Sequence, residues 1–435
     1  MKIQQQSSKL VTPSYENKSH VSSTSTTTPL GPFDRAAGDF HVPMIFAYKD
    51  PTPPNSTLEH GLSLILADYR EWAGRLTDDR RTIIVNDKGV PFIEAMASCT
   101  LDEAMPLESN PQLLDLHPSL KCMEELLQVQ LTRFTCGSLV VGCTTSHLVA
   151  DGQAVCFFLI AWGKATRGQW VSPTTMHCRA VIQPREPLSI EFDHLGVEYT
   201  EKRLVRDIPQ GEMVRNLRLH KAHFSPDFLA RLKGQASLGC TSGRGYSTVE
   251  SLVAHLWQKV AQLSMGRSET SRLRMTVNVH SRLVPPIPKD YFGNMVLLGD
   301  VRIGVSELLS KPLHQVAEVV RAAIAKVNDR YARSFVDFDA HIERHGDWSE
   351  LVPTPELDGF CPNLEVNSWL GFAFDDMDFG SGGPHVFLPS CLPDEGVMVI
   401  MPPMHGKRGI DIYLPLSDPN KALFQRITHS PLSDL

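Results

Sequence analysis

A histidine and an aspartate four residues apart form the segment best suited to chemistry. The sequence Ser146-His147-Leu148-Val149-Ala150-Asp151-Gly152 follows an apolar run and precedes a helix-like stretch. The end of a strand is a rigid place from which a side chain can point into a cleft, and a neutral imidazole there can accept a proton near pH 7. The pattern is typical of a general base, His147, with Asp151 holding the loop and Gly152 allowing a sharp turn.

The same residues also have a plainer interpretation. His147 could be a buried, hydrogen-bonded histidine of the core, and Asp151 could be only the N-cap of the following helix. In an arbitrary chain a lone histidine and aspartate at this spacing favour that interpretation. The motif therefore needs support from the rest of the sequence.

The surrounding residues predict the elements that position the motif. Residues 126–134 and 138–147 are predicted strands, and residues 152–166 have the single apolar face of a helix packed on a sheet. Because strands and helices alternate in both halves, the predicted fold class is α/β. Other predicted strands are 3–15, 40–48, 274–280, 361–374, 397–402 and 409–414; other predicted helices are 58–73, 225–234, 248–265, 313–335 and a short one after Asp418, while 19–28 is a predicted loop.

Length and composition exclude several classes of protein. A chain of 435 residues exceeds one hydrophobic core and predicts two domains of about 200 residues each. A net charge of −7 with scattered basic residues argues against nucleic-acid binding. No apolar stretch is long enough to span a membrane, and the polar N-terminus lacks the core of a signal peptide. Nine cysteines without a CxxC pair indicate reduced thiols, so we expect a cytoplasmic protein without a metal site.

Several motifs in register resemble the plant BAHD acyltransferases. Besides the HxxxDG motif, residues 277–294 resemble the family's arginine-containing segment that ends in Tyr-Phe-Gly-Asn. Asn367-Ser368-Trp369 resembles its TSW segment, and Asp378-Phe379-Gly380-Ser381-Gly382 resembles its DFGWG motif. Their order and spacing match over essentially the whole chain.

The resemblance implies a two-domain fold of the chloramphenicol-acetyltransferase type. Mixed sheets flanked by helices would form each domain, with an active-site channel between the domains. We expect an N-terminal domain over residues 1–190, a crossover connection over 191–218 and a C-terminal domain over 219–435. Acyl-CoA would be a substrate, so no cofactor is expected, and the other partner would be a small-molecule acceptor bound by a monomer.

The resemblance also implies a mechanism without a covalent acyl-enzyme. His147 would deprotonate the acceptor, which attacks the thioester carbonyl directly. Asn367 and Trp369 would stabilise the oxyanion and orient the thioester. The turn formed by Asp378, Gly380 and Gly382 would be structural.

This chain departs from the family pattern at two positions. Ser381 replaces the tryptophan of DFGWG, and His280-Ser281-Arg282 stands where the family has Arg-x-Arg or Arg-x-Lys. Because the family's aspartate pairs with an arginine of that segment, the partner of Asp151 could be His280, or Arg282 reaching round. We expect this pair to be weaker or pH-sensitive here.

The acceptor is expected to be an amine. Residues 126–134, 159–168 and 361–369 resemble the hydroxycinnamoyl-CoA transferases that acylate agmatine, putrescine or tryptamine. Shikimate-type members present hydroxyl residues near Met44 and a carboxylate-binding arginine near Thr354; the strand around Met44 is mostly apolar here, and acidic residues surround Thr354.

Glu365 is the predicted contact for a cationic acceptor. Two residues before Asn367 on a predicted strand, it should share that residue's face. The alternative for Glu365 is an ion pair with a nearby arginine or lysine. Alternatives for the whole protein are an ester-forming enzyme and a non-catalytic relative that only binds ligands or protein partners.

Overall fold

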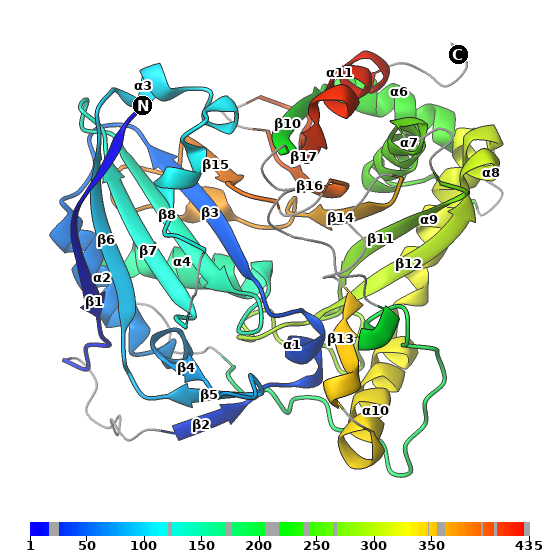
Figure 1. Ribbon diagram of the computed structural model, residues 1–435, viewed down its shortest axis with the longest axis horizontal. Helices are drawn as coiled ribbons and strands as arrows, with labels where there is room; N and C mark the ends of the chain where they lie inside the picture. Colours follow the sequence, from blue (N-terminus) through cyan, green and yellow to red (C-terminus); the bar gives the residue numbers. More distant parts are fainter. Residues whose placement is uncertain are drawn as a thin grey trace. The chain divides into compact units, whose positions relative to one another are not determined.

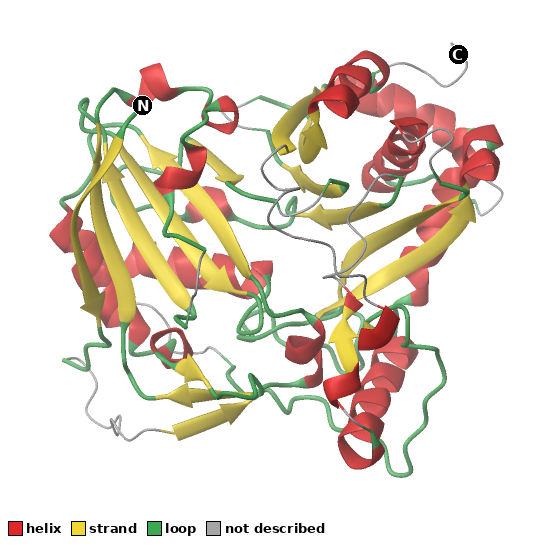
Figure 2. Ribbon diagram, viewed as in Figure 1, coloured by secondary structure: helices red, strands yellow, loops and turns green. Residues whose placement is uncertain are grey.

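The computed structural model divides into two compact units that are not consecutive halves of the chain. One unit comprises Met1–Gln183, Ile287–Met295 and Phe372–Cys391, and the other comprises the remaining residues. Each has its own six-stranded sheet packed with helices (Figures 1 and 2), so the predicted α/β class is confirmed. The described residues are 1–16, 26–120, 124–169, 176–204, 217–238, 243–263, 268–346, 348–354, 362–392, 395–403 and 407–429.

The first unit is built on a mixed sheet. Its strands lie in the order β1-β6-β7-β8-β3-β15, with β6 and β7 parallel and the other neighbours antiparallel. The predicted strand pair before the HxxxDG motif is confirmed as β7 and β8, and β8 is buried along its whole length. The bounds are β1 Ile3–Val11, β6 Val90–Ala97, β7 Leu127–Arg133, β8 Leu139–Ser146, β3 His41–Tyr48 and β15 Val386–Pro389.

Two helices of the first unit pack closely together (Figure 1). Helix α4, Gly152–Thr166, has the predicted bounds, and α2, Asn55–Leu66, ends before the predicted limit. Trp162 Nε1 donates to the carbonyl of Leu58 at 2.8 Å. A Cβ on Gly61 would lie 2.7 Å from backbone atoms of Thr166, so the glycine permits this approach.

Short elements of the first unit have weak sequence signals. The predicted loop 19–28 is wrong for residues 26–28, which belong to β2; residues 19–25 lie outside the described part of the chain. The residues after α2 form a 3-10 turn, Arg70–Ala73, instead of continuing the helix. The remaining elements are β2 Thr26–Pro29, β4 Arg75–Leu76 and β5 Thr82–Val85, which form a separate three-stranded sheet, with helices α1 Pro32–Ala36 and α3 Leu101–Ala104.

The second unit has a sheet in the order β10-β17-β16-β14-β11-β12. Strand β14 is parallel to both neighbours, and the other pairs are antiparallel. Trp257 is fully buried in the hydrophobic core of this unit. The strands are β10 Leu217–Phe224, β17 Ile410–Ser417, β16 Val397–Met401, β14 Leu364–Ser368, β11 Thr270–Asn278 and β12 Val296–Gly304; the helices are α6 Pro226–Ser237, α7 Thr248–Leu263, α8 Val305–Ser310, α9 Leu313–Lys326 and α11 Asp418–Ile427.

The single helix predicted over residues 313–335 is wrong. The structure has two helices, α9 and α10 Asp329–His345, because Asn328 is a helix N-cap whose side chain accepts from the amide of Tyr331 at 3.1 Å. No helix in the described ranges is both long and apolar enough to cross a bilayer. Free thiols within the described ranges include Cys99, Cys136, Cys143, Cys156 and Cys178.

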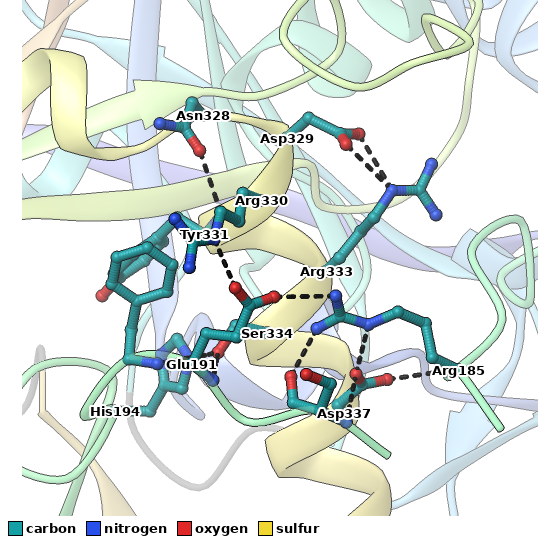
Figure 3. A network of polar contacts seen from close by, with 12 residues as sticks. Arg185, Glu191, His194, Asn328, Asp329, Arg330, Tyr331, Arg333, Ser334 and Asp337 are labelled. Atoms are coloured by element: carbon teal, nitrogen blue, oxygen red, sulfur yellow. Dashed lines mark hydrogen bonds and ion pairs between the residues drawn. The ribbon is translucent and has the colours of Figure 1, made fainter. Parts of the chain in front are cut away.

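The connection after residue 183 is held on α10 by side chains (Figure 3). Asp337 accepts from Arg185 Nε at 2.6 Å and from the amide of Ser189 at 2.9 Å. Ser334 Oγ accepts from the amide of Glu191 at 2.9 Å and lies 3.0 Å from Nε2 of buried His194. Strand β9, Tyr199–Glu201, then pairs with β13, Leu351–Pro353; residues 205–216 of the predicted crossover lie outside the described residues.

Candidate active site

His147 directly follows the last residue of strand β8 and lies beside the start of the neighbouring strand β3. The His147 amide donates to the carbonyl of Phe40 at 2.9 Å, and the two ring centroids are 5.0 Å apart. The side chain is half-buried, and its Nδ1 atom is fully buried. The strand-end position predicted for the imidazole is therefore present.

Two carbonyls of the loop from His147 to Asp151 accept hydrogen bonds from side chains. Asn294 Nδ2 donates to the carbonyl of His147 at 2.8 Å, and an Arg179 NH2 donates to the carbonyl of Val149 at 2.8 Å. The Asp151 amide in turn donates to the carbonyl of Gly293 at 3.3 Å. The Tyr-Phe-Gly-Asn segment thus lies directly against the histidine loop.

Asp151 is a buried N-cap with an additional structural bond. Its Oδ1 accepts from the amides of Gln153 and Ala154 at 3.0 Å, and its Oδ2 accepts from the amide of Met295 at 2.9 Å. Burial raises the pKa of Asp151, and the amide bonds and the adjacent His147 oppose that rise. The carboxylate joins the start of α4 to the residue after the Tyr-Phe-Gly-Asn segment. Asp151 is therefore the helix N-cap and also holds the loop that carries His147.

Asp151 accepts from amides of its own unit, and the ion pair predicted with His280 or Arg282 stays a prediction. Burial lowers the pKa of His280 to about 4, so its ring is neutral at pH 7, and its Nδ1 lies 2.9 Å from Oδ1 of Asn278. Arg282 donates to the carbonyls of Ile324 and Val327, both at 2.8 Å, at the end of α9. Because three amides already donate to Asp151, its carboxylate requires no cation.

A buried ion pair contacts the histidine loop through its arginine. Arg179 NH1 is 2.8 Å from Oδ1 of Asp34, and both side chains are at most 2% exposed. The same Asp34 oxygen accepts from the amide and from Nδ2 of Asn294, both at 2.9 Å. Sequence reasoning missed Asp34 and Arg179, and it recognised Asn294 only as the end of a motif.

Two of the residues predicted for oxyanion and acceptor binding, Asn367 and Glu365, lie on one face of strand β14 in the second unit. Burial alternates along β14, with Glu365 and Asn367 on the less buried face. Glu365 Oε2 is 2.9 Å from an NH2 of Arg274 on β11. Thr276 on the same strand donates a short hydrogen bond to Asn367 Oδ1. The alternative given for Glu365, an ion pair with a nearby arginine, is therefore present.

The structure also gives the local contacts or burial of three other predicted site residues: Thr354, Trp369 and Met44. Thr354 is buried; its carbonyl accepts from Arg274 NH1 at 2.9 Å and its amide donates to the carbonyl of Glu198 at 2.9 Å. The Trp369 amide donates to the carbonyl of Ile400 at 2.8 Å. Met44 lies in β3 with 3% exposure, which leaves little of its surface for a ligand. Their roles in binding stay predictions.

Gly152 is required for a reason other than the predicted sharp turn. It is the first residue of α4, and a Cβ there would lie 2.5 Å from the ring of Phe372. The glycine therefore lets an aromatic ring of the same unit pack on the start of the helix.

The Asp378 turn supports the other end of α4. Asp378 Oδ1 accepts from the amides of Gly380 at 2.7 Å and Gly382 at 2.8 Å, and Oδ2 is 2.5 Å from Arg167 NH1. Positive φ angles of 123° and 90° explain the two glycines. These bonds hold the turn together and against α4, and its purely structural role stays a prediction.

We predict that Gly163→Ala lowers the free energy of unfolding by about 1–3 kcal/mol. A Cβ on Gly163 would lie 2.6 Å from the carbonyl oxygen of Asp378, so helix and turn must separate. Denaturant unfolding measures the change. The matched control is Gly234→Ala in helix α6, where a Cβ meets nothing within 4 Å and should be neutral or stabilising. Equal stability of the two variants would contradict the tight packing.

Comparison with known proteins identifies the class to which this fold and site belong. The chain belongs to the Transferase family, the BAHD acyltransferases, whose family model matches residues 1–429. The resemblance inferred from the sequence motifs is confirmed.

Curated relatives match over nearly the full chain. Agmatine hydroxycinnamoyltransferase 1 of Oryza sativa subsp. japonica is 40% identical over 96% of both chains. Agmatine coumaroyltransferase-1 of Hordeum vulgare is 39% identical over 99% of this chain and 100% of that protein. Tryptamine hydroxycinnamoyltransferase 2 of Oryza sativa subsp. japonica is 38% identical over 92% of both.

Solved structures share the fold at low sequence identity. Vinorine synthase covers 97% of this chain and 96% of its own, with a TM-score of 0.71 and 22% identity. F. graminearum TRI101 complexed with coenzyme A and deoxynivalenol covers 92% and 97%, with a TM-score of 0.76 and 17% identity. The predicted fold is therefore confirmed.

Proposed function

We propose that this protein transfers a hydroxycinnamoyl group from its CoA thioester to an amine, forming an amide, with His147 as the general base. The observation that carries the proposal is the near-full-length similarity to relatives named for hydroxycinnamoyl transfer to agmatine and tryptamine, at 38–40% identity. The strand-end imidazole in its fixed loop supplies the base that such a reaction needs.

The proposed reaction is a direct attack on the thioester. The amine nitrogen bonds to the carbonyl carbon, the carbon–sulfur bond breaks, and the proton lost by nitrogen passes through His147 to the CoA sulfur. Burial lowers the pKa of His147 from its usual 6.5, although the charge of Asp151 and hydrogen bonding of the ring to its own carbonyl and to Asn294 act in the opposite direction. The imidazole is therefore neutral and able to accept a proton at pH 7.

We predict that the slope of log kcat/KM against pH changes from one to two below pH 6.5. Protonation of the amine alone gives a slope of one, and protonation of His147 adds a second as the pH falls through its lowered pKa. The measurement is a pH–rate profile with a simple amine acceptor. His147→Ala should show no such break, and a break above pH 6.5 in the parent enzyme would contradict the assignment.

Asn367 is the proposed oxyanion donor. Because the hydroxyl of Thr276 donates to Asn367 Oδ1, the amide nitrogen Nδ2 is left as the donor for a ligand. Loss of such a donor typically costs about 100- to 1000-fold in rate. Trp369, one residue beyond the strand, is proposed to orient the thioester.

Glu365, Thr354 and Met44 are the proposed acceptor-binding residues. The Glu365 side chain retains 13% exposure beside Arg274, so its carboxylate can still meet the distant cation of a diamine or a guanidine. The reacting nitrogen must be neutral, so this contact serves the far end of the acceptor. Arg274 nevertheless offsets part of the negative charge.

We predict that Glu365→Gln raises KM for agmatine and putrescine more than for tryptamine or a neutral alcohol, while acyl-CoA affinity is retained. Steady-state kinetics with the four acceptors measures the effect. The matched control is Asp300→Asn, which removes the ion pair between Asp300 on β12 and Arg272 on β11, the strand that also carries Arg274. If both variants change KM equally for all four acceptors, the Glu365–Arg274 pair is structural, and Glu365 is not an acceptor-binding residue.

A mass-spectrometric screen tests the proposed function as a whole. Coumaroyl-, feruloyl-, benzoyl- and acetyl-CoA would each be incubated with a panel of amines and alcohols. Amides formed from cinnamoyl-type donors are the expected products. Esters alone would assign the protein to alcohol acylation, and the absence of any product would favour a non-catalytic relative.

A further inference from the structure

Two buried polar atoms of the first unit complement each other beside the proposed base. His147 Nδ1 and Asn294 Oδ1 are both buried, and within the described ranges neither makes a hydrogen bond of standard geometry with another group. Hydrogen bonding between the His147 ring and the Asn294 side chain nevertheless contributes to the pKa of His147, so the two side chains are close enough to interact. An amide oxygen only accepts, whereas an imidazole nitrogen donates or accepts according to its tautomer. The two atoms therefore match only when the proton of the neutral ring is on Nδ1.

The orientation of the Asn294 amide is fixed by its other contacts. Its nitrogen donates to Oδ1 of Asp34 at 2.9 Å and to the carbonyl of His147 at 2.8 Å. A carboxylate and a carbonyl can only accept, so a reversed amide would place oxygen against two oxygens. Asn294 must keep its nitrogen toward these acceptors, and Oδ1 remains available to the imidazole.

Asp34 accepts hydrogen bonds through both of its side-chain oxygens. Arg179 lies 2.8 Å from its Oδ1, and the amides of Asn294 and Gly31 donate to Oδ1 and Oδ2 at 2.9 and 2.8 Å. The Arg179 guanidinium also donates to Val149 within the histidine loop. One buried ion pair thus fixes both the orientation of Asn294 and a loop carbonyl.

We propose that Asn294 is a positioning residue that keeps the proton of neutral His147 on Nδ1, and that Asp34 with Arg179 sets the orientation of Asn294. Nε2 is then the basic nitrogen that faces the reaction. The inference rests on the proposed role of His147 as the base. Without Asn294, both tautomers and additional ring orientations become accessible, and the reactive fraction falls.

A double-mutant cycle tests this inference. Asn294→Ala and Asp34→Asn would each be made with His147 intact and with His147→Ala. With His147 present, we expect kcat to fall on the order of 10- to 100-fold while KM for acyl-CoA changes less than about twofold. In the His147→Ala background neither change should lower the residual rate further, because the histidine through which they act is gone.

The control is a second asparagine of the same unit that also joins polar side chains. Asn55 Nδ2 donates to Glu94 at 2.9 Å, and its Oδ1 accepts from Arg133 at 2.8 Å. Asn55→Ala should lower Tm without lowering kcat. An equal fall in kcat for Asn294→Ala with and without His147 would overturn the inference, whereas normal turnover of His147→Ala would instead overturn the proposed base.

A spectroscopic measurement reports the tautomer without activity. Nitrogen-15 histidine spectra, with the His147 signal assigned by its loss in His147→Gln, distinguish protonated Nδ1 from protonated Nε2. We expect the Nδ1-protonated form in the parent and a mixture in Asp34→Asn, a nearly isosteric change that serves if Asn294→Ala does not fold. An unchanged tautomer in both variants would overturn the inference.

Discussion

Replacing His147 with alanine should lower turnover by about 100- to 10,000-fold, with little change in acyl-CoA binding. The imidazole is the only group proposed to accept the proton of the acceptor, and its ring is not proposed to hold the CoA. Turnover would be measured with saturating substrates and acyl-CoA affinity by calorimetry.

A neighbouring histidine supplies the control for this result. His41 begins β3 opposite Ser146, and its Nε2 lies 2.9 Å from the carbonyl of Glu125. Burial lowers the pKa of His41 as well, so both rings are neutral at pH 7 and differ in position. His41→Ala should keep most of the turnover. Near-normal activity of His147→Ala would remove His147 as the base.

Asp151→Asn should lower both stability and turnover. An asparagine has one acceptor oxygen, so its NH2 must face at least one of the amides of Gln153, Ala154 and Met295 that now donate to the carboxylate. Losing one such bond and leaving a buried donor unsatisfied costs about 1–3 kcal/mol. The loop that carries His147 then loosens, and the rate falls with it.

The two effects of Asp151→Asn can be separated with an ordinary helix cap. Ser225→Ala removes the N-cap of α6, whose hydroxyl accepts from the amide of Phe228 at 3.3 Å, and should cost about 1 kcal/mol without a comparable loss of turnover. Thermal unfolding and kcat would be measured for both variants. An Asp151→Asn protein as stable as the parent but inactive would show that Asp151 acts directly in the chemistry.

The sequence predicted those parts of the site that depend on neighbouring residues. Helix α4 has its predicted bounds because its apolar face and its Asp151 cap lie within 16 residues. The alternation along β14 correctly placed Glu365 with Asn367. In both cases the signal is a periodicity or a cap, which neighbouring residues determine.

The parts that could not be predicted depend on contacts between distant residues. Asp34 and Arg179 are 145 positions apart, and the residues around each give no sequence pattern that predicts a buried ion pair. Arg274 reaches Glu365 only because β11 and β14 pair in one register. The partner of Asp151 was missed because a backbone amide, such as that of Met295, leaves no signature in the side chains.

The discontinuous first unit constrains how the protein can be made on the ribosome. Its sheet acquires the edge strand β15, Val386–Pro389, and its histidine loop acquires the contacts of Asn294 and Met295, from chain synthesised long after residue 183. Domains generally fold as units in the order of synthesis. Here β3 has no partner strand on one side until β15 has been synthesised, near the end of the chain. His147 and the residues that fix its loop therefore come together late, and a nascent chain stalled before residue 286 would carry His147 without the contacts of Asn294 and Met295.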